Sequence, residues 1–155
     1  MNNSVPVSIE HFLQESKIPI RLSCVMESGW PAVLSLWYLF DGGSLFCATP
    51  ETARIVSYLR AEPRCSFEVA SDQPPYCGVR GRAIAVIDRE RGVEILERLL
   101  FRYLGDVDNP LAKKLLGRTG FEVAIRLEPQ NFYTWNFTNR MADSLARESA
   151  KICPG

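Results

Sequence analysis

The sequence predicts a mainly β fold, a small antiparallel barrel of six or seven strands with a few α-helices. Short apolar or alternating runs recur along the chain, and several are joined by glycine-bearing turns that are typical of hairpins. Helical patterns follow only some of these runs, whereas a parallel sheet needs a helix after nearly every strand. The length of 155 residues and the 46% of apolar residues suit one core, so we expect a single domain over residues 1–155.

The N-terminal part of the chain begins with a short helix and continues with strands. Ser8 is the candidate N-cap of a helix that ends at Glu15, and its apolar positions repeat at helical spacing. We expect this helix, within residues 1–17, to act as a lid or brace. The next runs predict three adjacent antiparallel strands: IRLSCVM, PAVLSLWYLF and, after the turn Asp41-Gly42-Gly43, SLFCA.

The following segment predicts a helix whose first turn is rich in polar groups. Thr49 stands at an N-cap position, Pro50 at the first helical position, and Pro63 ends the helix. The first turn of such a helix presents unpaired backbone N–H groups, to which Thr52 adds a hydroxyl and Arg54 a guanidinium. These groups suit a phosphate monoester. The alternative, in which Thr49 only caps the helix and Arg54 is only solvated, stays open from spacing alone.

Four more runs predict the remaining strands. RCSFEVA and VRGRAIAVI are joined by a loop over residues 71–76, and Gly81 marks a bulge or a close approach by another group. FEVAIRL and NFYTWNF add the last two strands. This completes the predicted sheet.

Two helices and a tail complete the pattern. Asp88 is a candidate cap for a helix from Arg89 to Leu104, where apolar residues recur at helical spacing. A shorter helix over residues 110–116 is predicted to end at Gly117 in a left-handed conformation. Residues 141–155 are predicted to form a polar helical tail.

Composition argues against several function classes. The 18 basic and 18 acidic side chains balance, so we expect neither a nucleic-acid nor a membrane partner, and the longest apolar stretch is too short for a membrane helix. The five cysteines are odd in number and form no CxxC pair, which predicts reduced thiols in a cytoplasmic protein. His11 is the only histidine, so neither a hydrolase triad nor a metal site is expected.

A spaced set of short motifs extends from Ile18 to Met141. Its members are Arg21-Leu22, Gly29-x-Pro31, Leu36-Trp37, Asp41-Gly42-Gly43, Ala48-Thr49, Arg54, Leu59, Pro63-Arg64, Gly81 and IRLEPQNFYTWNFTNRM. This set resembles the FMN-binding split-barrel family related to pyridoxamine 5'-phosphate oxidase. The resemblance covers most of the chain and implies an FMN-dependent oxidoreductase that works as a homodimer, with the cofactor at the interface.

The resemblance also implies which residues surround the cofactor. The phosphate is expected at the turn and helix that contain Thr49, and the isoalloxazine ring along the strand that contains Leu36. Trp135 falls where an aromatic residue of the partner subunit often covers the flavin. The full set of implied cofactor-binding residues is Leu34, Ser35, Leu36, Trp37, Ala48, Thr49, Thr52, Arg54, Tyr76, Gly78, Trp135 and Arg140. No side chain is implied as a catalytic acid or base, since the flavin supplies the chemistry.

Two departures from the family pattern leave the substrate and the cofactor open. Ile55 stands where many members have a second phosphate-binding cation, a lysine, and its loss weakens FMN binding by roughly one to two decades unless another basic group substitutes. Residues 136–140 lack the Arg-x-His pair of the vitamin B6 oxidases, so oxidation of pyridoxamine phosphate is not expected. A deazaflavin-dependent reductase and a non-enzymatic module that binds flavin or haem are the alternatives.

Several implied site residues also have purely structural interpretations. Trp37 and Trp135 can be core residues, because a core of this size accommodates large aromatic side chains. Tyr76 follows two prolines and can simply order its loop, and Arg140 can pair with Asp143. The sequence does not separate these interpretations from a role in cofactor binding.

Overall fold

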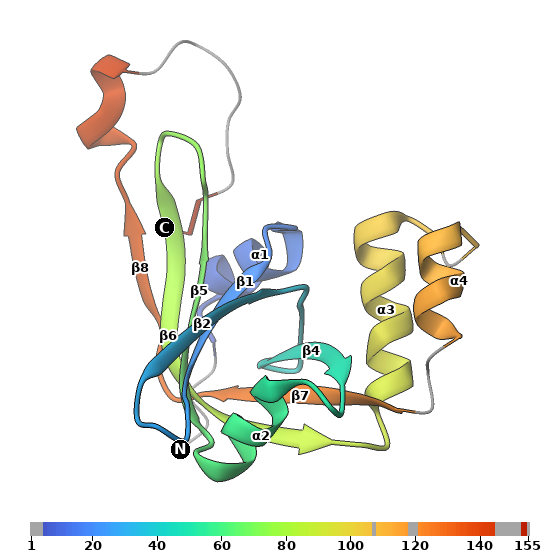
Figure 1. The fold of residues 1–155 in the computed structure, drawn as a ribbon. Helices are drawn as coiled ribbons and strands as arrows, with labels where there is room; N and C mark the ends of the chain where they lie inside the picture. Colours follow the sequence, from blue (N-terminus) through green and yellow to red (C-terminus); the bar gives the residue numbers. More distant parts are fainter. Residues whose placement is uncertain (1–4, 107, 118–120, 145–152, 155) are drawn as a thin grey trace.

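The structure, a computed structural model, describes residues 5–106, 108–117, 121–144 and 153–154. One curled antiparallel sheet forms most of it, with helices at its margins (Figure 1). The mainly β fold predicted from the sequence is confirmed. The elements are α1 (Val7–Glu15), β1 (Ile20–Val25), β2 (Pro31–Leu36), β3 (Leu39–Asp41), β4 (Ser44–Pro50), α2 (Arg54–Ala61), β5 (Arg64–Ala70), β6 (Cys77–Asp88), α3 (Gly92–Leu104), α4 (Pro110–Leu116), β7 (Glu122–Pro129), β8 (Tyr133–Asn136) and the 3-10 helix η2 (Asn139–Ser144).

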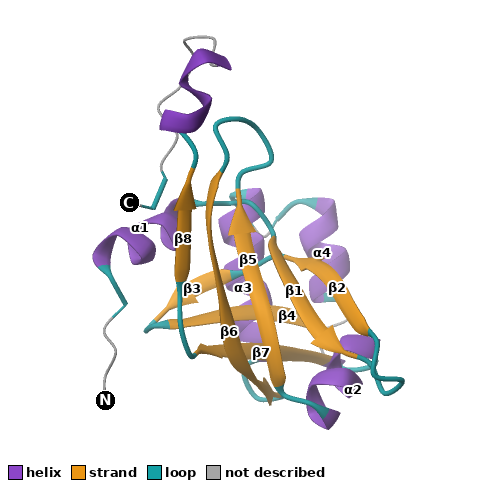
Figure 2. Cartoon of the chain, turned by 90° about the vertical axis from the view of Figure 1, so that its left-hand side faces the viewer, coloured by secondary structure: helices purple, strands orange, loops and turns teal. Residues whose placement is uncertain are grey.

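The sheet changes partners along its longest strand, β6. Its strand order is β2-β1-β5-β6-β7-β4-β3, and β8 pairs with β6 outside this path. The first part of β6 pairs with β8 and the last part with β7, while β5 follows it along the other edge (Figure 2). Gly81 lies at the change of partner, where an added Cβ would be 2.2 Å from the backbone oxygen of Asn131. The close approach predicted at Gly81 is therefore confirmed.

The predicted group of three adjacent strands is wrong. The run PAVLSLWYLF forms two strands, β2 and β3, which lie at opposite ends of the sheet, so the described residues form eight strands rather than six or seven. The run breaks because Tyr38 turns inward, where its side chain is completely buried. Trp37 beside it stacks on Tyr103 of α3, with ring centroids 4.9 Å apart. Tertiary contacts of two aromatic residues thus override a continuous strand pattern.

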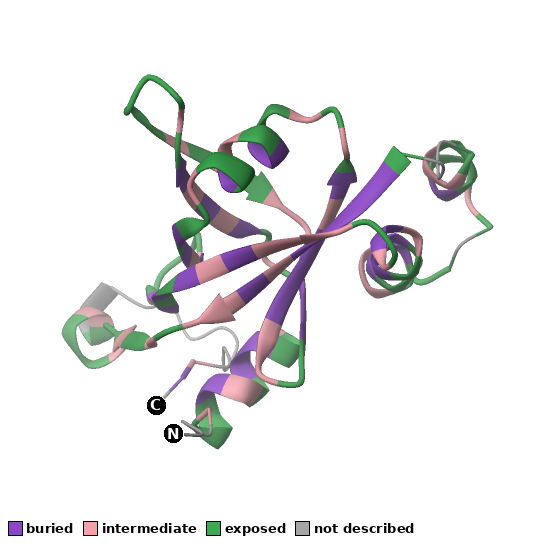
Figure 3. Cartoon of the chain, turned by 90° about the horizontal axis from the view of Figure 1, so that it is seen from below, coloured by how far each residue is buried: buried purple, intermediate pink, exposed green. Residues whose placement is uncertain are grey.

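The core occupies the inside of the curled sheet and is covered by α1 and α2. Buried side chains from both helices and from most strands form one cluster, and buried and exposed positions alternate along several strands (Figure 3). A second, smaller cluster lies between α3 and the strands β3, β4 and β7. It consists of Leu39, Phe46, Ile95, Leu99 and Ala124. The helices therefore close the open sides of the barrel.

The helix ends differ in part from the predictions. The apolar face of α1 is buried as expected, but Pro6 is its N-cap and Ser8 lies inside the helix. Proline starts this helix because its fixed φ suits the first turn and its missing N–H costs nothing there. Gly117 has a right-handed φ of −65°, so the predicted left-handed cap is wrong at this position. Gly105, at the end of α3, has the left-handed conformation instead, with φ 82°.

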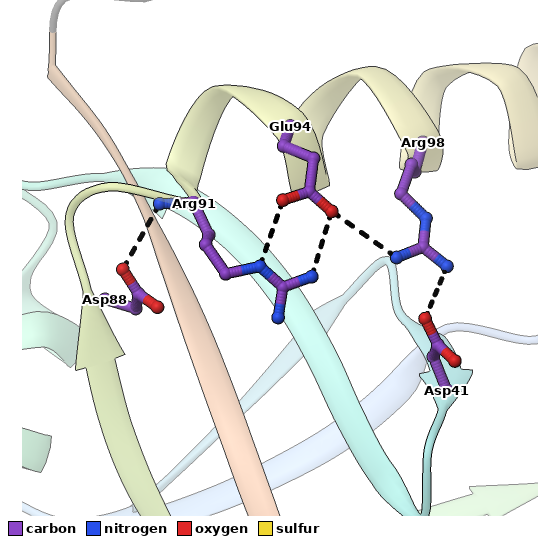
Figure 4. Close-up of polar contacts among 5 residues, drawn as sticks. All are labelled: Asp41, Asp88, Arg91, Glu94 and Arg98. Atoms are coloured by element: carbon purple, nitrogen blue, oxygen red, sulfur yellow. Dashed lines mark hydrogen bonds and ion pairs between the residues drawn. The ribbon is translucent and has the colours of Figure 1, made fainter.

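A chain of polar contacts fastens α3 to the β3–β4 hairpin (Figure 4). The carboxylate of Asp88 accepts hydrogen bonds from the backbone N–H groups of Glu90 and Arg91 in the turn before α3. The predicted cap at Asp88 is wrong, because α3 starts only at Gly92 and its N-cap is Arg91. Glu94 binds Arg91 through two hydrogen bonds, and Arg98 reaches Asp41 at 2.8 Å. All of these groups are partly exposed, so water screens the pairs and each contributes little to the stability of the fold.

A disulfide corrects the expectation that all five cysteines are thiols. Cys77 and Cys153 are bonded to each other, and their Cα atoms are 5.8 Å apart. Cys24, Cys47 and Cys65 are free and buried, and burial raises the pKa of all three thiols, to about 12 for Cys47 and Cys65. Of the predicted polar tail, η2 covers the start, and residues 145–152 and 155 lie outside the described residues.

The described helices contain no segment that is both long and apolar enough to cross a lipid bilayer.

Hydrogen bonds from Tyr38 and from α3 hold the C-terminal turn of α1, the helix that is predicted to act as a lid or brace. The hydroxyl of Tyr38 donates to the backbone oxygens of Leu13 and Ser16 at 2.9 and 3.1 Å. From α3, the guanidinium of Arg102 donates to the backbone oxygens of Gln14 and Ser16. These carbonyls belong to the C-terminal turn of α1, where a helix leaves its acceptors unpaired. Tyr38 and Arg102 thus supply the hydrogen-bond donors for the backbone oxygens at the C-terminal end of α1.

We expect Tyr38→Phe to lower the free energy of unfolding by about 1 kcal/mol, because the backbone oxygens of Leu13 and Ser16 each lose one of two donors and keep only Arg102. Urea denaturation followed by circular dichroism measures the change. Tyr58→Phe is the matched control, since Tyr58 lies on α2 and its hydroxyl has no hydrogen-bond partner in the described part of the chain. Equal effects of the two substitutions would contradict a specific role of Tyr38.

We expect Glu122→Gln to stabilise the fold at neutral pH. Glu122 is only 8% exposed, and burial raises the pKa of its carboxyl above the ordinary value of 4.5. The wild-type protein therefore loses stability as the pH rises from about 4.5 through the raised pKa, and the glutamine variant does not. Thermal unfolding between pH 4 and 8 measures this difference, with the exposed Glu97→Gln on α3 as control. A difference that stays constant with pH would contradict the prediction.

Candidate functional site

The turn between β4 and α2 is the region that the sequence predicts for phosphate binding. The predicted helix start at Thr49 and Pro50 is wrong, because both residues continue β4 in register with β7. Thr49 is buried at 8% exposure, whereas Thr52 is exposed in the turn. The helix α2 starts at Arg54 and has no side-chain cap, so its first backbone N–H groups lack a side-chain acceptor. The ladder of β4 with β7 thus delays the helix by one turn.

Basic side chains surround this turn. Arg54 is exposed and forms no ion pair with any residue that the structure describes. Arg60 and Arg89 both donate to the same oxygen of Glu51, at 2.7 and 2.6 Å. The hydrogen bonds from Arg60 and then Arg89 lower the pKa of the Glu51 carboxyl. One carboxylate therefore faces two guanidinium groups, and Arg54 adds a third positive charge on the same segment.

The sequence did not indicate that Arg60 and Arg89 contact Glu51 in this turn. Arg60 lies in the last turn of α2, and Arg89 directly follows β6, far away along the chain. No local pattern connects either residue with Glu51, because only the pairing of β6 with β7 and of β7 with β4 brings the end of β6 to this corner. Both are candidates for the basic group that replaces the missing lysine at Ile55, which is itself buried at 2% exposure.

The strand predicted to carry the ring system is an edge strand. β2 pairs with β1 along its whole length and with no other strand among the described residues, so one of its edges keeps unpaired backbone groups. Leu34 and Leu36 pack against the core, and Ser35 is exposed on the opposite face. Trp37 lies beyond the end of β2 and stacks on Tyr103 of α3. Ala48 packs beside the same helix. One backbone edge of Leu34–Leu36 is thus unpaired among the described strands.

The remaining predicted site residues gather at the end of the β6–β8 ladder. Gly78 and Trp135 are opposite each other, and a Cβ added to Gly78 would be 2.8 Å from the indole ring. The backbone oxygen of Tyr76 accepts a hydrogen bond from the N–H of Phe137. Arg140 lies 5.8 Å from the ring centroid of Phe137. The side chain of Asp143 lies outside the described side chains, so its predicted pairing with Arg140 stays a prediction.

The predicted residues thus form two groups within one chain. The first group lies on β2, β4 and the start of α2, and the second on β6, β8 and the segments beside them. Between described residues, no hydrogen bond, ion pair or ring contact joins the two groups. Across the sheet, β1, β5 and β6 separate β2 from β8, which at ordinary strand spacing is about 19 Å.

A groove on the outer face of the sheet lies between these groups. Its volume is 520 Å³. One row of residues crosses five strands on this face, because Ser35, Arg21, Glu68, Arg80 and Tyr133 are opposite one another in successive pairs. The groove is lined by Arg21, Ser23, Val33, Ser66, Phe67, Glu68, Arg80, Gly81, Arg82 and Tyr133.

The charges of this groove are mostly positive. Arg21 lies 3.5 Å from Glu68, while Arg80 and Arg82 have no carboxylate partner in the described ranges. The guanidinium of Arg80 lies over Trp135, 5.5 Å from the ring centroid. Sequence reasoning missed this face, although arginines two positions apart in β6 were a usable signal because alternate residues of a strand share one face. The face suits an anionic or aromatic ligand, or a second protein surface.

The described residues contain no group of three or more His, Cys, Asp or Glu side chains that is suited to hold a metal ion. The only histidine, His11, is exposed on α1, outside both groups of predicted site residues.

No protein-family model matches the sequence, and no curated protein sequence is similar to it. Solved structures do match. A structure named F420 reductase has a TM-score of 0.69 and 24% identity, covering 83% of this chain and 98% of that one. The conserved hypothetical protein Rv2991 from Mycobacterium tuberculosis has a TM-score of 0.74 and 19% identity, with 95% and 92% of the two chains covered. A candidate pyridoxamine 5'-phosphate oxidase from Listeria innocua has a TM-score of 0.61 and 17% identity, with coverages of 80% and 92%.

At these identities the likeness is one of fold. The match spans most of this chain and nearly all of each matched chain, so it extends over the whole fold and not only over a fragment. The protein has the same split-barrel fold as these solved structures.

Proposed function

We propose that this chain is an FMN-dependent oxidoreductase that works as a homodimer and transfers a hydride between a donor such as a reduced nicotinamide and a small acceptor. One observation carries the proposal: strand β2, which is predicted to carry the ring, and the second group of predicted residues, on β6 and β8, flank one polar sheet face in this fold. Such an arrangement suits a cofactor that lies between two subunits, each of which supplies one group. The flavin supplies the hydride chemistry when it is bound, and the chain binds and orients it.

The turn before α2 is the proposed phosphate site. Uncapped N–H groups at a helix start favour an anion, and the hydroxyl of Thr52 and the guanidinium of Arg54 are exposed beside them. Three arginines with a single carboxylate leave two positive charges there, which matches the charge of a phosphate monoester. Thr49 is too buried to be a main contact, so within this turn Thr52 and Arg54 carry the proposal.

The open edge of β2 is the proposed site of the ring system. Along such an edge, alternate residues present their backbone N–H and C=O outward. These groups can meet the donors and acceptors of a flavin ring, and they need no catalytic side chain. Trp135 and Gly78 form the proposed second wall, contributed by the other subunit. The packing of the indole on Gly78 and Arg80 fixes its plane before any ligand arrives.

A deazaflavin is the second candidate cofactor, because the matched structure with the highest identity of those given above is named F420 reductase. Another protein of the same fold is named HutZ, the haem storage protein from Vibrio cholerae, with a TM-score of 0.63 and 18% identity. A haem site usually needs an axial ligand such as histidine. The exposed position of His11 on α1 therefore makes haem the weakest of the three candidates.

The absorbance spectrum of the purified protein tests the proposal. We expect an oxidised-flavin spectrum, or its appearance after addition of micromolar FMN, and release of FMN on denaturation as identified by mass spectrometry. A released deazaflavin would support the second candidate. If FMN, deazaflavin and haem all fail to bind at micromolar concentration, the proposal is wrong.

Arg54→Ala should raise the dissociation constant of FMN by about tenfold or more, because a charge-assisted bond to the phosphate is lost. Riboflavin, which lacks the phosphate, should bind the variant and the wild type equally well. Titration of flavin fluorescence measures both affinities. The matched control is Arg64→Ala, since Arg64 is exposed and already paired with Glu62. An unchanged affinity for FMN would show that Arg54 is only a surface charge.

A further inference from the structure

The disulfide lies at one end of the ladder between β6 and β8. Cys77 is the first residue of β6 and is opposite Asn136, the last residue of β8. Cys77 is 1% exposed, Cys153 is half-buried, and Pro154 after it is buried. The C-terminal end of the described chain accordingly lies beside β6 and β8 (Figures 1 and 2). Cys77 therefore both pairs with β8 and carries the disulfide to Cys153.

At this position the disulfide restrains the end of β8. The chain leaves the ladder at Asn136 and is bonded again at Cys153 to the residue opposite Asn136. The chain between Asn136 and Cys153 is thus held at Cys77 at both of its ends. Closing a loop of this length removes entropy from the states in which β8 is detached, and so favours its pairing. Without the bond, β8 is a four-residue edge strand that pairs only with β6 among the described strands.

Trp135 depends directly on this strand. Its ring contacts the space beside Gly78 and lies under the guanidinium of Arg80. Both of these partners belong to β6, so the indole keeps its place only while β8 stays paired with β6. A change in the pairing of β8 is therefore a change in the position of Trp135.

We propose that the Cys77–Cys153 disulfide is a reversible redox latch that fixes β8, and with it Trp135, on the sheet. A dithiol reductant attacks one sulfur and then resolves the mixed disulfide. Overall the S–S bond breaks, two electrons and two protons convert the cystine to two thiols, and the reductant becomes a disulfide. The half-buried Cys153 is the accessible side for this attack, since Cys77 is enclosed. In a reducing compartment such as the cytoplasm, disulfides are commonly transient and redox-sensing.

The other three cysteines do not compete for this exchange. Cys24, Cys47 and Cys65 are buried in the core, and burial raises the pKa of each thiol. Thiolates are the attacking species in disulfide exchange, so these residues stay unreactive while the latch opens and closes. The latch is therefore confined to one pair.

The test combines thiol counting with hydrogen exchange on the full chain. After treatment with oxidised glutathione, alkylation in denaturant should label three of the five cysteines, and all five after reduction with dithiothreitol. In the native protein, reduction should speed amide exchange in β8 and in the first residues of β6 by about tenfold or more. Amides of β1 and β5 should keep their rates, because the main core does not involve the bond.

Cys153→Ser separates the latch from other effects of the reductant. This variant should exchange like the reduced wild type, and dithiothreitol should not change it further. Five labelled cysteines after oxidation, or equal exchange of β8 in the oxidised and reduced states, would overturn the proposal. None of these readouts uses a cofactor, so they stand apart from the outcome for FMN.

Discussion

The change of partner along β6 is the constraint on which the rest of the fold depends. At Gly81 the chain between β7 and β8 crosses so closely that a side chain would collide with the backbone of Asn131. The N–H of Arg82 donates to the side chain of Asn131, and the N–H of Gln130 donates to the oxygen of Arg82, which fixes this crossing. β7 and β8 therefore follow different halves of β6. The split divides the sheet into one part from β2 to β8 and another from β7 to β3.

The helices divide between the two halves in a way that leaves the outer face free. α1 is held by Tyr38 and Arg102, and α3 by Asp41 and the small apolar cluster beside β4. α2 packs near β1 and β6 at the lower margin of the sheet. No described helix covers the groove between β2 and β8. The unpaired charges of Arg80 and Arg82 accordingly lie on the one face that the fold leaves uncovered.

The proposed cofactor wall and the proposed latch use the same weakly supported strand. β8 contributes Trp135 and has neither a second strand partner nor a large share of the buried core in the described chain. Short edge elements with few buried contacts are the parts of a protein that open most easily. The disulfide at Cys77, at the end of this strand pair, supplies the restraint that packing does not. The two proposals therefore couple redox state to cofactor contact through a single strand.

The sequence by itself determined most of the local structure. Alternation and glycine-bearing turns gave the strands, and the spacing of residues such as Ile55, Val56 and Leu59 gave the buried face of α2. These features are local, since the period of a strand or helix is written in neighbouring residues. The resemblance predicted the same split-barrel fold that the matched solved structures have.

Only the tertiary structure decided how these elements combine. The break at Trp37 and Tyr38 follows from contacts with α1 and α3, and the late start of α2 follows from the pairing of β4 with β7. The meeting of Arg89 with Glu51 and the bond between Cys77 and Cys153 join residues far apart in the chain. Such partners are selected by the free energy of the whole packed sheet, which no short window of residues contains.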